Sequence, residues 1–196
     1  MTLFVLFRAH LQHHLNMRDT TAVRDVLLKQ FDIAWSLMAY HLDELTTQEC
    51  LWKPAARCLH VVERKPGSWH AQWPEHERYD IGPPTIAWTT WHICYWWSKT
   101  LEHVEGRSAT VSPDLEWAGS ANGVRLRIDD LRQKWRAILE NSSETQWEES
   151  RPDSWPLPNS DLQTIAAWLN VELMKNAAEL GMIRFLYAVR ENAGGL

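Results

Sequence analysis

The sequence predicts an all-α protein: a four-helix bundle with one long irregular or hairpin insertion between the first and second long helices. Two observations support this prediction. Four long stretches carry apolar side chains at helical spacing, and only residues 53–84 have the composition of strands and turns. The chain has 196 residues, of which 45% are hydrophobic and 23% charged, and this is sufficient for one domain with its own core.

The first long helix is expected at about 21–45, where Leu27, Phe31 and Met38 share one face. Threonines at its start offer N-caps. The sequence TTQE that follows at 46–49 is a capping-box pattern, so a short helix should begin there and end before Pro54. Residues 53–84 then place β-forming residues on both sides of a Lys-Pro-Gly turn, which predicts a small hairpin or an ordered loop.

The second long helix should begin near Thr85, in the stretch TIAWTTWHICYWWSKTLEHVEG. It is apolar on nearly all sides, which favours a central position. The third helix is expected at about 121–141. The fourth is expected at about 161–190, after a Trp-Pro loop, with residues 160–163 as its capping box. The chain has 13 Trp against 4 Phe and 4 Tyr, which predicts aromatic pockets or an indole-lined core.

Residues 17–196 are expected to form a single domain, and residues 1–16 a disordered or misannotated leader whose apolar run is too short to span a bilayer. The three cysteines form no CxxC pair and no disulfide framework, which favours the reducing cytoplasm. The net charge is −5 and no basic run offsets it. We therefore expect neither a membrane nor a nucleic-acid partner.

Three polar residues occupy or flank the apolar face of the last helix. Asn176 lies within this face, and Glu172 and Glu179 lie one above the other on its edge. Two interpretations remain open. The carboxylates reach solvent and Lys175 bridges them through i, i+3 and i, i+4 pairs, or they project into a cavity and bind a cation, because buried carboxylates are costly without a partner.

The second long helix offers a partner for these carboxylates. An aromatic face surrounds His92, and its members are Trp88, Trp91, Tyr95 and Trp96. A lone His on such a face is more often a satisfied core residue than a ligand. Together with Glu172 and Glu179, however, it would suit a divalent ion such as Zn²⁺, Ni²⁺ or Mn²⁺. The expected pocket consists of these aromatic residues with Lys175 and Asn176.

Three segments together resemble the DinB-like (YfiT-like) superfamily, and specifically its Trp-rich branch. They are LDELTTQECLWKPA, TIAWTTWHICYWW and ELMKNAAELGMIRFLYAV, and the resemblance covers roughly residues 20–190. It implies an up-down-down-up bundle with a three-histidine metal site. One ligand would come from the second helix and two, at i and i+4, from the last. The family includes thiol S-transferases and a maleylpyruvate isomerase that use low-molecular-weight thiols.

When the family's metal ligands are transferred to this sequence by position, the ligand from the second helix corresponds to His92. The pair in the last helix, placed by its spacing to Gly181, falls on Lys175 and Glu179. This departs from the family pattern because an ammonium cannot bind a metal. Glu172 or Asn176 would be stand-ins, and a full three-histidine zinc site would need His41 or another histidine.

The sequence therefore supports two functions and leaves open whether the chain is an enzyme. The first is a divalent-metal-dependent thiol S-transferase-like enzyme with a degenerate site at His92, Glu179 and Glu172, in which the metal activates a low-molecular-weight thiol. The alternative is a metal-free small-ligand-binding or structural bundle in which Lys175 replaces the metal charge. In both cases we expect a small-molecule partner, and we also expect a homodimer.

Overall fold

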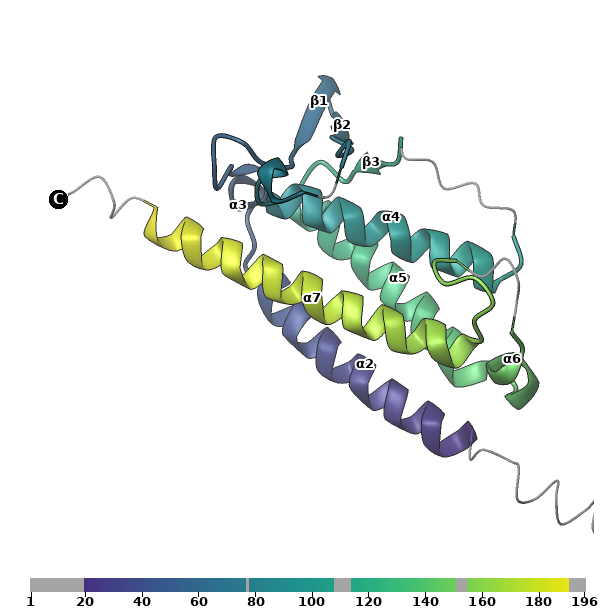
Figure 1. Cartoon of the computed structure of the whole chain (residues 1–196). Helices are drawn as coiled ribbons and strands as arrows, with labels where there is room; N and C mark the ends of the chain where they lie inside the picture. Colours follow the sequence, from purple (N-terminus) through teal and green to yellow (C-terminus); the bar gives the residue numbers. More distant parts are fainter. Residues whose placement is uncertain (1–19, 77, 108–113, 151–154, 191–196) are drawn as a thin grey trace, which may run out of the picture.

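The computed structural model describes residues 20–76, 78–107, 114–150 and 155–190, and its main feature is four long helices packed lengthwise (Figure 1). They are α2 (Thr20–Leu42), α4 (Ile86–Val104), α5 (Ala121–Asn141) and α7 (Leu162–Val189). α2 and α7 run in one direction, and α4 and α5 run in the other. The expected leader at 1–16 lies outside the described residues.

Side-chain caps fix where the long helices begin. Thr85 accepts a hydrogen bond from the backbone N–H of Trp88 at the start of α4, and Ser120 caps α5 in the same way. The last helix differs from the prediction by one residue. Asp161, rather than Ser160, accepts from the N–H of Thr164, and the carboxylate also complements the positive end of the helix dipole.

The insertion contains both a helix and a hairpin. α3 (Thr47–Leu51) begins with the capping box predicted at Thr46 and Glu49. Strands β1 (Val61–Lys65) and β2 (Ser68–Ala71) are antiparallel. Gly67 turns between them with φ +81°, a value that favours glycine. A 3₁₀ turn, η1 (Tyr79–Ile81), precedes α4.

The expectation of an all-α chain with one insertion needs two corrections. A third strand, β3 (Glu116–Trp117), comes from the loop between α4 and α5 and pairs antiparallel with β2, so the described residues include a three-stranded sheet of order β1-β2-β3. A short helix, α6 (Glu144–Glu148), follows α5 with its own capping box. Both are too short for apolar periodicity to reveal them.

The core fills the space between the four long helices and is rich in indole rings. Its largest buried side chains include Trp91, Trp97, Trp135, Trp147 and Phe31. Cys50, Cys58 and Cys94 are also buried. Burial raises the pKa of Cys94 to about 12, so this thiol is a poor nucleophile. Among the described helices, none is long and apolar enough to cross a membrane.

The packing of α7 on α2 is fixed by one close approach and one anchored guanidinium. A Cβ atom at Gly181 would lie 2.5 Å from Cε1 of the His41 imidazole, so only glycine fits there. Arg184 donates from Nε to Glu49 (3.1 Å) and from Nη1 to the carbonyl oxygens of His41 (3.1 Å) and Asp43 (2.9 Å). These contacts set which face of α7 turns toward α4.

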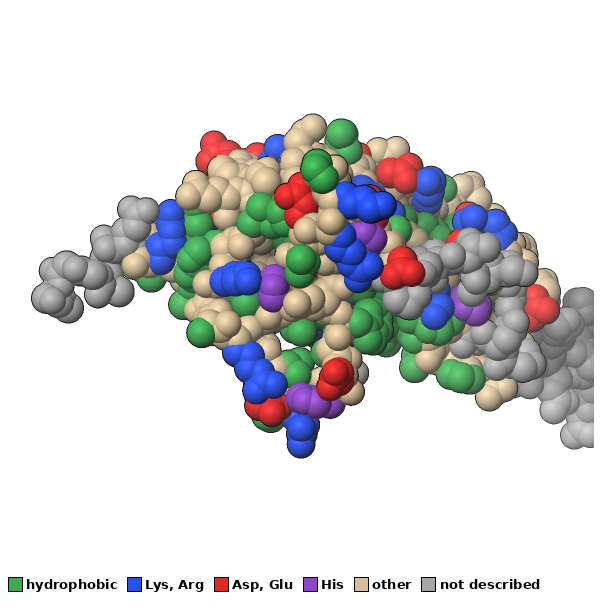
Figure 2. All heavy atoms as spheres, turned by 90° about the horizontal axis from the view of Figure 1, so that it is seen from above, with side chains coloured by type: hydrophobic (Ala, Val, Ile, Leu, Met, Phe, Trp, Pro, Cys, Tyr) green, Lys and Arg blue, Asp and Glu red, His purple; other side chains and the backbone are tan. Residues whose placement is uncertain are grey.

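The face that carries the insertion is polar. In Figure 2, Lys and Arg side chains alternate there with Asp, Glu and His, and hydrophobic side chains lie between them. This side therefore carries charges of both signs rather than one continuous field.

Candidate functional site

The candidate site lies between α4 and α7, with His92 at its centre. Positions 88, 92 and 96 follow one another on one side of α4 because they are separated by four residues. The indole of Trp88 stacks on the imidazole of His92, with ring centroids 4.9 Å apart and planes at 12°. Trp96 meets the other side of His92 edge-on at 6.4 Å. The imidazole is thus held between two indoles.

α7 supplies the polar groups that face this imidazole. Lys175 Nζ lies 2.6 Å from Glu172 Oε2, which is a short ion pair. Asn176 is only 1% exposed, and its Nδ2 donates to the backbone carbonyl of Glu172 at 2.7 Å. Its Oδ1 is buried and has no well-aligned hydrogen-bond donor in the described structure. The amide nevertheless acts on the His92 imidazole as an acceptor, because it raises the pKa of that group.

The electrostatics of His92 show that these groups are close together. Burial is the largest influence on this imidazole, and with the neighbouring Lys175 ammonium it lowers the pKa to about 4. The Glu172 carboxylate and the Asn176 amide favour the charged form but do not overcome this effect. His92 is therefore a neutral imidazole at neutral pH.

Glu179 lies one turn further along α7 and is the remaining polar side chain of the candidate site. Burial raises the pKa of its carboxyl, the Glu172 carboxylate adds to the rise, and the Lys175 ammonium opposes it. Among the residues that the structure describes, the Glu179 carboxylate makes no hydrogen bond and no ion pair. Lys175 instead makes its close ion pair with Glu172, so Glu179 is the carboxylate available to another cation.

The predicted site residues fall into two groups in the structure. His92, Glu172, Lys175 and Asn176 lie together, and Glu179 is linked to them through Lys175 and Glu172. Glu172 and Asn176 form an i, i+4 pair beside His92. Lys175 is the charged side chain with the largest influence on His92, and it belongs to the pair Lys175 and Glu179 to which the resemblance points.

The aromatic residues predicted for the pocket also divide. Trp88 and Trp96 flank His92. Trp91 and Tyr95 stack on each other at 5.5 Å, and Trp73 of the insertion covers both rings edge-on, at 5.6 and 5.3 Å. The Trp91 indole donates to the carbonyl of Leu115 at 2.6 Å. These two rings therefore attach Trp73 of the insertion and the segment around Leu115, between α4 and α5, to α4.

Two further indoles extend the site and were absent from the predicted pocket. Trp168 of α7 meets Trp96 edge-on at 5.2 Å, and Trp155, from the loop before α7, meets Trp168 at 5.8 Å. The ammonium of Lys99 lies over the Trp155 ring at 5.1 Å, which is a cation–π distance. The helical wheel of α7 places Trp168 on the same side as Glu172. Trp155 follows no periodic pattern that could locate it.

The donor set fits a metal ion poorly. Within the described ranges, no three His, Cys, Asp or Glu side chains are close enough to share an ion, and this includes the predicted set His92, Glu172 and Glu179. Lys175 has no lone pair to offer while it is charged, and it already occupies Glu172. His41 cannot complete the set, because it packs against Gly181 on the α2 side of α7.

The depressed pKa of His92 predicts an acid-labile contribution to stability. The unfolded chain binds this proton near pH 6.5 and the folded chain only near pH 4. The contribution is therefore complete above pH 6.5 and declines as the pH falls toward 4, by up to about 1.4 kcal/mol per pH unit. Urea unfolding of the wild type and His92→Asn across this window should show a steeper loss for the wild type. Parallel profiles would contradict the burial of a neutral imidazole.

Comparison with known proteins gives the chain a family but no characterised relative. No curated protein and no solved structure matches it significantly. The sequence model of the DinB superfamily matches residues 30–180, which is most of the chain and contains α4 and nearly all of the site on α7. The chain therefore belongs to the DinB superfamily.

Proposed function

We propose that this DinB-superfamily chain is a four-helix bundle that binds a small organic cation between α4 and α7 without a metal ion. The observation that carries this proposal is the 2.6 Å ion pair between Lys175 and Glu172 beside a neutral His92. The Lys175 ammonium lies beside Glu172 and His92, two side chains that could otherwise bind a metal ion. Replacing a cation with an ammonium keeps a carboxylate satisfied.

The charge balance of the site favours a cationic ligand. Lys175 neutralises Glu172 and His92 contributes no charge, while burial raises the pKa of the Glu179 carboxyl, so a cation beside Glu179 would stabilise its ionised form. The Oδ1 of Asn176, which interacts with the His92 imidazole without a well-aligned hydrogen bond, adds an acceptor. A ligand N–H group that reaches both Glu179 and Asn176 would gain two acceptors.

The indoles around His92 favour a flat or quaternary ligand. Trp88 and Trp168 are only partly buried, so their rings offer faces and edges to a bound molecule. A cation over an indole face gains about 0.5–2 kcal/mol, depending on how well solvent is excluded. The substrate class that fits is therefore an amine with an aromatic or other flat apolar body.

A second candidate function includes a metal ion at this site. His92 is already in its neutral, ligand-competent form, and Glu179 has no partner among the described residues. These two observations favour a divalent-metal-dependent thiol S-transferase-like enzyme that uses Zn²⁺, Ni²⁺ or Mn²⁺ and a low-molecular-weight thiol. Lys175 counts against this function, because its ammonium would repel the ion.

The ligand proposal predicts discrimination by charge. In calorimetric titrations near neutral pH, the protein should bind phenethylammonium and should not bind 3-phenylpropionate, which has a similar shape and the opposite charge. Glu179→Gln should weaken binding of the amine by about 10-fold or more, because a charge-assisted hydrogen bond contributes about 1.5–3 kcal/mol.

The matched control for this titration is Glu144→Gln, which neutralises an exposed carboxylate on α6 and should leave the affinity unchanged. Equal binding of the anion, no binding of the amine, or an equal loss in both variants would each contradict a cation site at Glu179.

Metal content separates the two functions. We expect protein purified without a His tag to contain much less than one Zn, Ni or Mn per chain, and His92→Ala to leave that content unchanged. Elemental analysis by mass spectrometry measures it. A stoichiometric metal that is lost on His92→Ala would overturn the metal-free proposal and favour the thiol transferase.

A further inference from the structure

The insertion forms an open pocket of its own, hereafter the insertion pocket. Its volume is about 660 Å³, within the roughly 300–1,000 Å³ that is typical of small-molecule sites. One wall is a face of the β1–β2 hairpin, and the other consists of residues 57–59 and 73–76 with Ile81. Apart from Asp114, all lining residues come from 57–81, so this pocket is separate from the site between α4 and α7.

The hairpin presents its inner face to the core and its outer face to this pocket. On the inner face, Trp69 packs edge-on against the buried Trp117 of β3, with ring centroids 5.8 Å apart. Side chains alternate between the two faces along a strand. The outer positions that line the pocket are Val62, Arg64, His70 and Gln72. The sheet therefore holds a row of polar side chains in fixed places along one wall.

Trp73 gives the opposite wall an aromatic surface. Its edge-on contacts with Trp91 (5.6 Å) and Tyr95 (5.3 Å) hold the ring on one side. The residue is nevertheless 54% exposed, so the rest of the indole is free to contact a bound molecule. Further apolar side chains in the lining are Leu59, Val62, Pro74 and Ile81. A ligand that fits this pocket therefore has an apolar or aromatic part.

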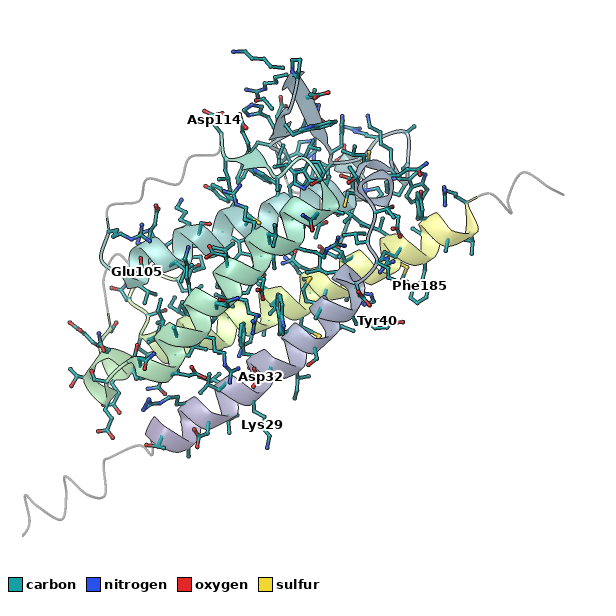
Figure 3. The ribbon with its side chains drawn as sticks, turned by 180° about the vertical axis from the view of Figure 1, so that it is seen from behind. Lys29, Asp32, Tyr40, Glu105, Asp114 and Phe185 are labelled. Atoms are coloured by element: carbon teal, nitrogen blue, oxygen red, sulfur yellow. The ribbon has the colours of Figure 1, made fainter. Side chains whose placement is uncertain are left out.

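The acidic and basic side chains of the lining balance each other. Arg57 and Arg64 are basic, and Glu75 and Asp114 are acidic. Figure 3 labels Asp114 beside the strands. A ligand with a single net charge would be attracted by one pair and repelled by the other. A zwitterion, which carries one charge of each sign, gains from both pairs.

One charge of each sign in the lining has no counter-ion. Arg57 lies 3.9 Å from the Asp80 carboxylate. By contrast, the side chains of Arg64 and Glu75 make no hydrogen bond and no ion pair with any residue that the structure describes. A guanidinium suits a ligand carboxylate, and a carboxylate accepts from a ligand ammonium. Because Arg64 and Glu75 do not pair with each other, a ligand between them can satisfy both.

We propose that the insertion pocket binds an apolar amino acid or a dipeptide that contains one. Its carboxylate pairs with Arg64, its ammonium pairs with Glu75, and its apolar side chain packs against Trp73. This site goes beyond the cation site proposed above and is independent of it, because its lining includes no residue of α4 or α7. The two sites also differ in selectivity, since only the insertion pocket requires a ligand carboxylate.

Calorimetric titration of the full chain with L-phenylalanine and with glycyl-L-phenylalanine tests the proposal, and at least one of them should bind. Arg64→Gln should weaken that binding at least about 5-fold, because a charge-assisted hydrogen bond in a partly solvated pocket is lost. Val62→Trp should prevent it by filling the pocket without changing a charge. Both side chains are exposed, so circular dichroism of the two variants should match the wild type.

The matched control is Lys65→Gln, which removes an exposed positive charge from the next position of β1, outside the pocket lining, and should leave the affinity unchanged. Binding of neither probe, or an equal loss in Lys65→Gln and Arg64→Gln, would overturn the proposal. So would binding that is lost in Glu179→Gln but kept in Arg64→Gln, because the probe would then occupy the site between α4 and α7. If Val62→Trp fails to fold, Arg64→Gln alone decides.

Discussion

The ion pair between Lys175 and Glu172 is the interaction on which the electrostatics of the candidate site depend. The ammonium lies 2.6 Å from one carboxylate and helps to keep His92 neutral. The ion pair therefore affects both carboxylates. Glu172 is occupied by the ammonium, and the pKa of the Glu179 carboxyl is raised by burial and by the Glu172 carboxylate. In a partly desolvated site a single ammonium can replace a bound cation electrostatically, but it provides no open coordination position.

The scaffold positions this pair from the opposite side of α7. Gly181 lets α7 approach His41 closely, and Arg184 ties it to the end of α2 and to Glu49. Because these contacts fix the rotation of α7, they turn Glu172 and Asn176 toward His92. The indoles at 88 and 96 hold the imidazole from its own helix. The α2–α7 interface therefore sets the rotation of α7, and the α4–α7 interface carries the polar groups.

The sequence was sufficient for the long helices and for the presence of a polar site, but not for its register. Apolar periodicity placed the third helix at 121–141, as observed, and the capping box at Thr46 and the helix start near Thr85 are confirmed. β3 has two residues and exists only through pairing with β2, so no local pattern predicts it. The pair Lys175 and Glu179 was assigned from its spacing to Gly181, and it stays a prediction, because helix rotation depends on tertiary packing that spacing alone does not give. Trp155 lies in a loop, where spacing carries little information.

His92 lies beside Glu172 and Asn176, and we propose that the Lys175 ammonium, rather than a metal ion, serves this group. The most direct test is the zinc content of an untagged Lys175→Ala, Asn176→His double variant, which frees Glu172 and provides two imidazoles and one carboxylate, a donor set suited to Zn²⁺. We expect about one zinc per folded chain, lost when His92→Ala is added. A folded double variant that takes up no zinc would contradict the proximity of these three positions.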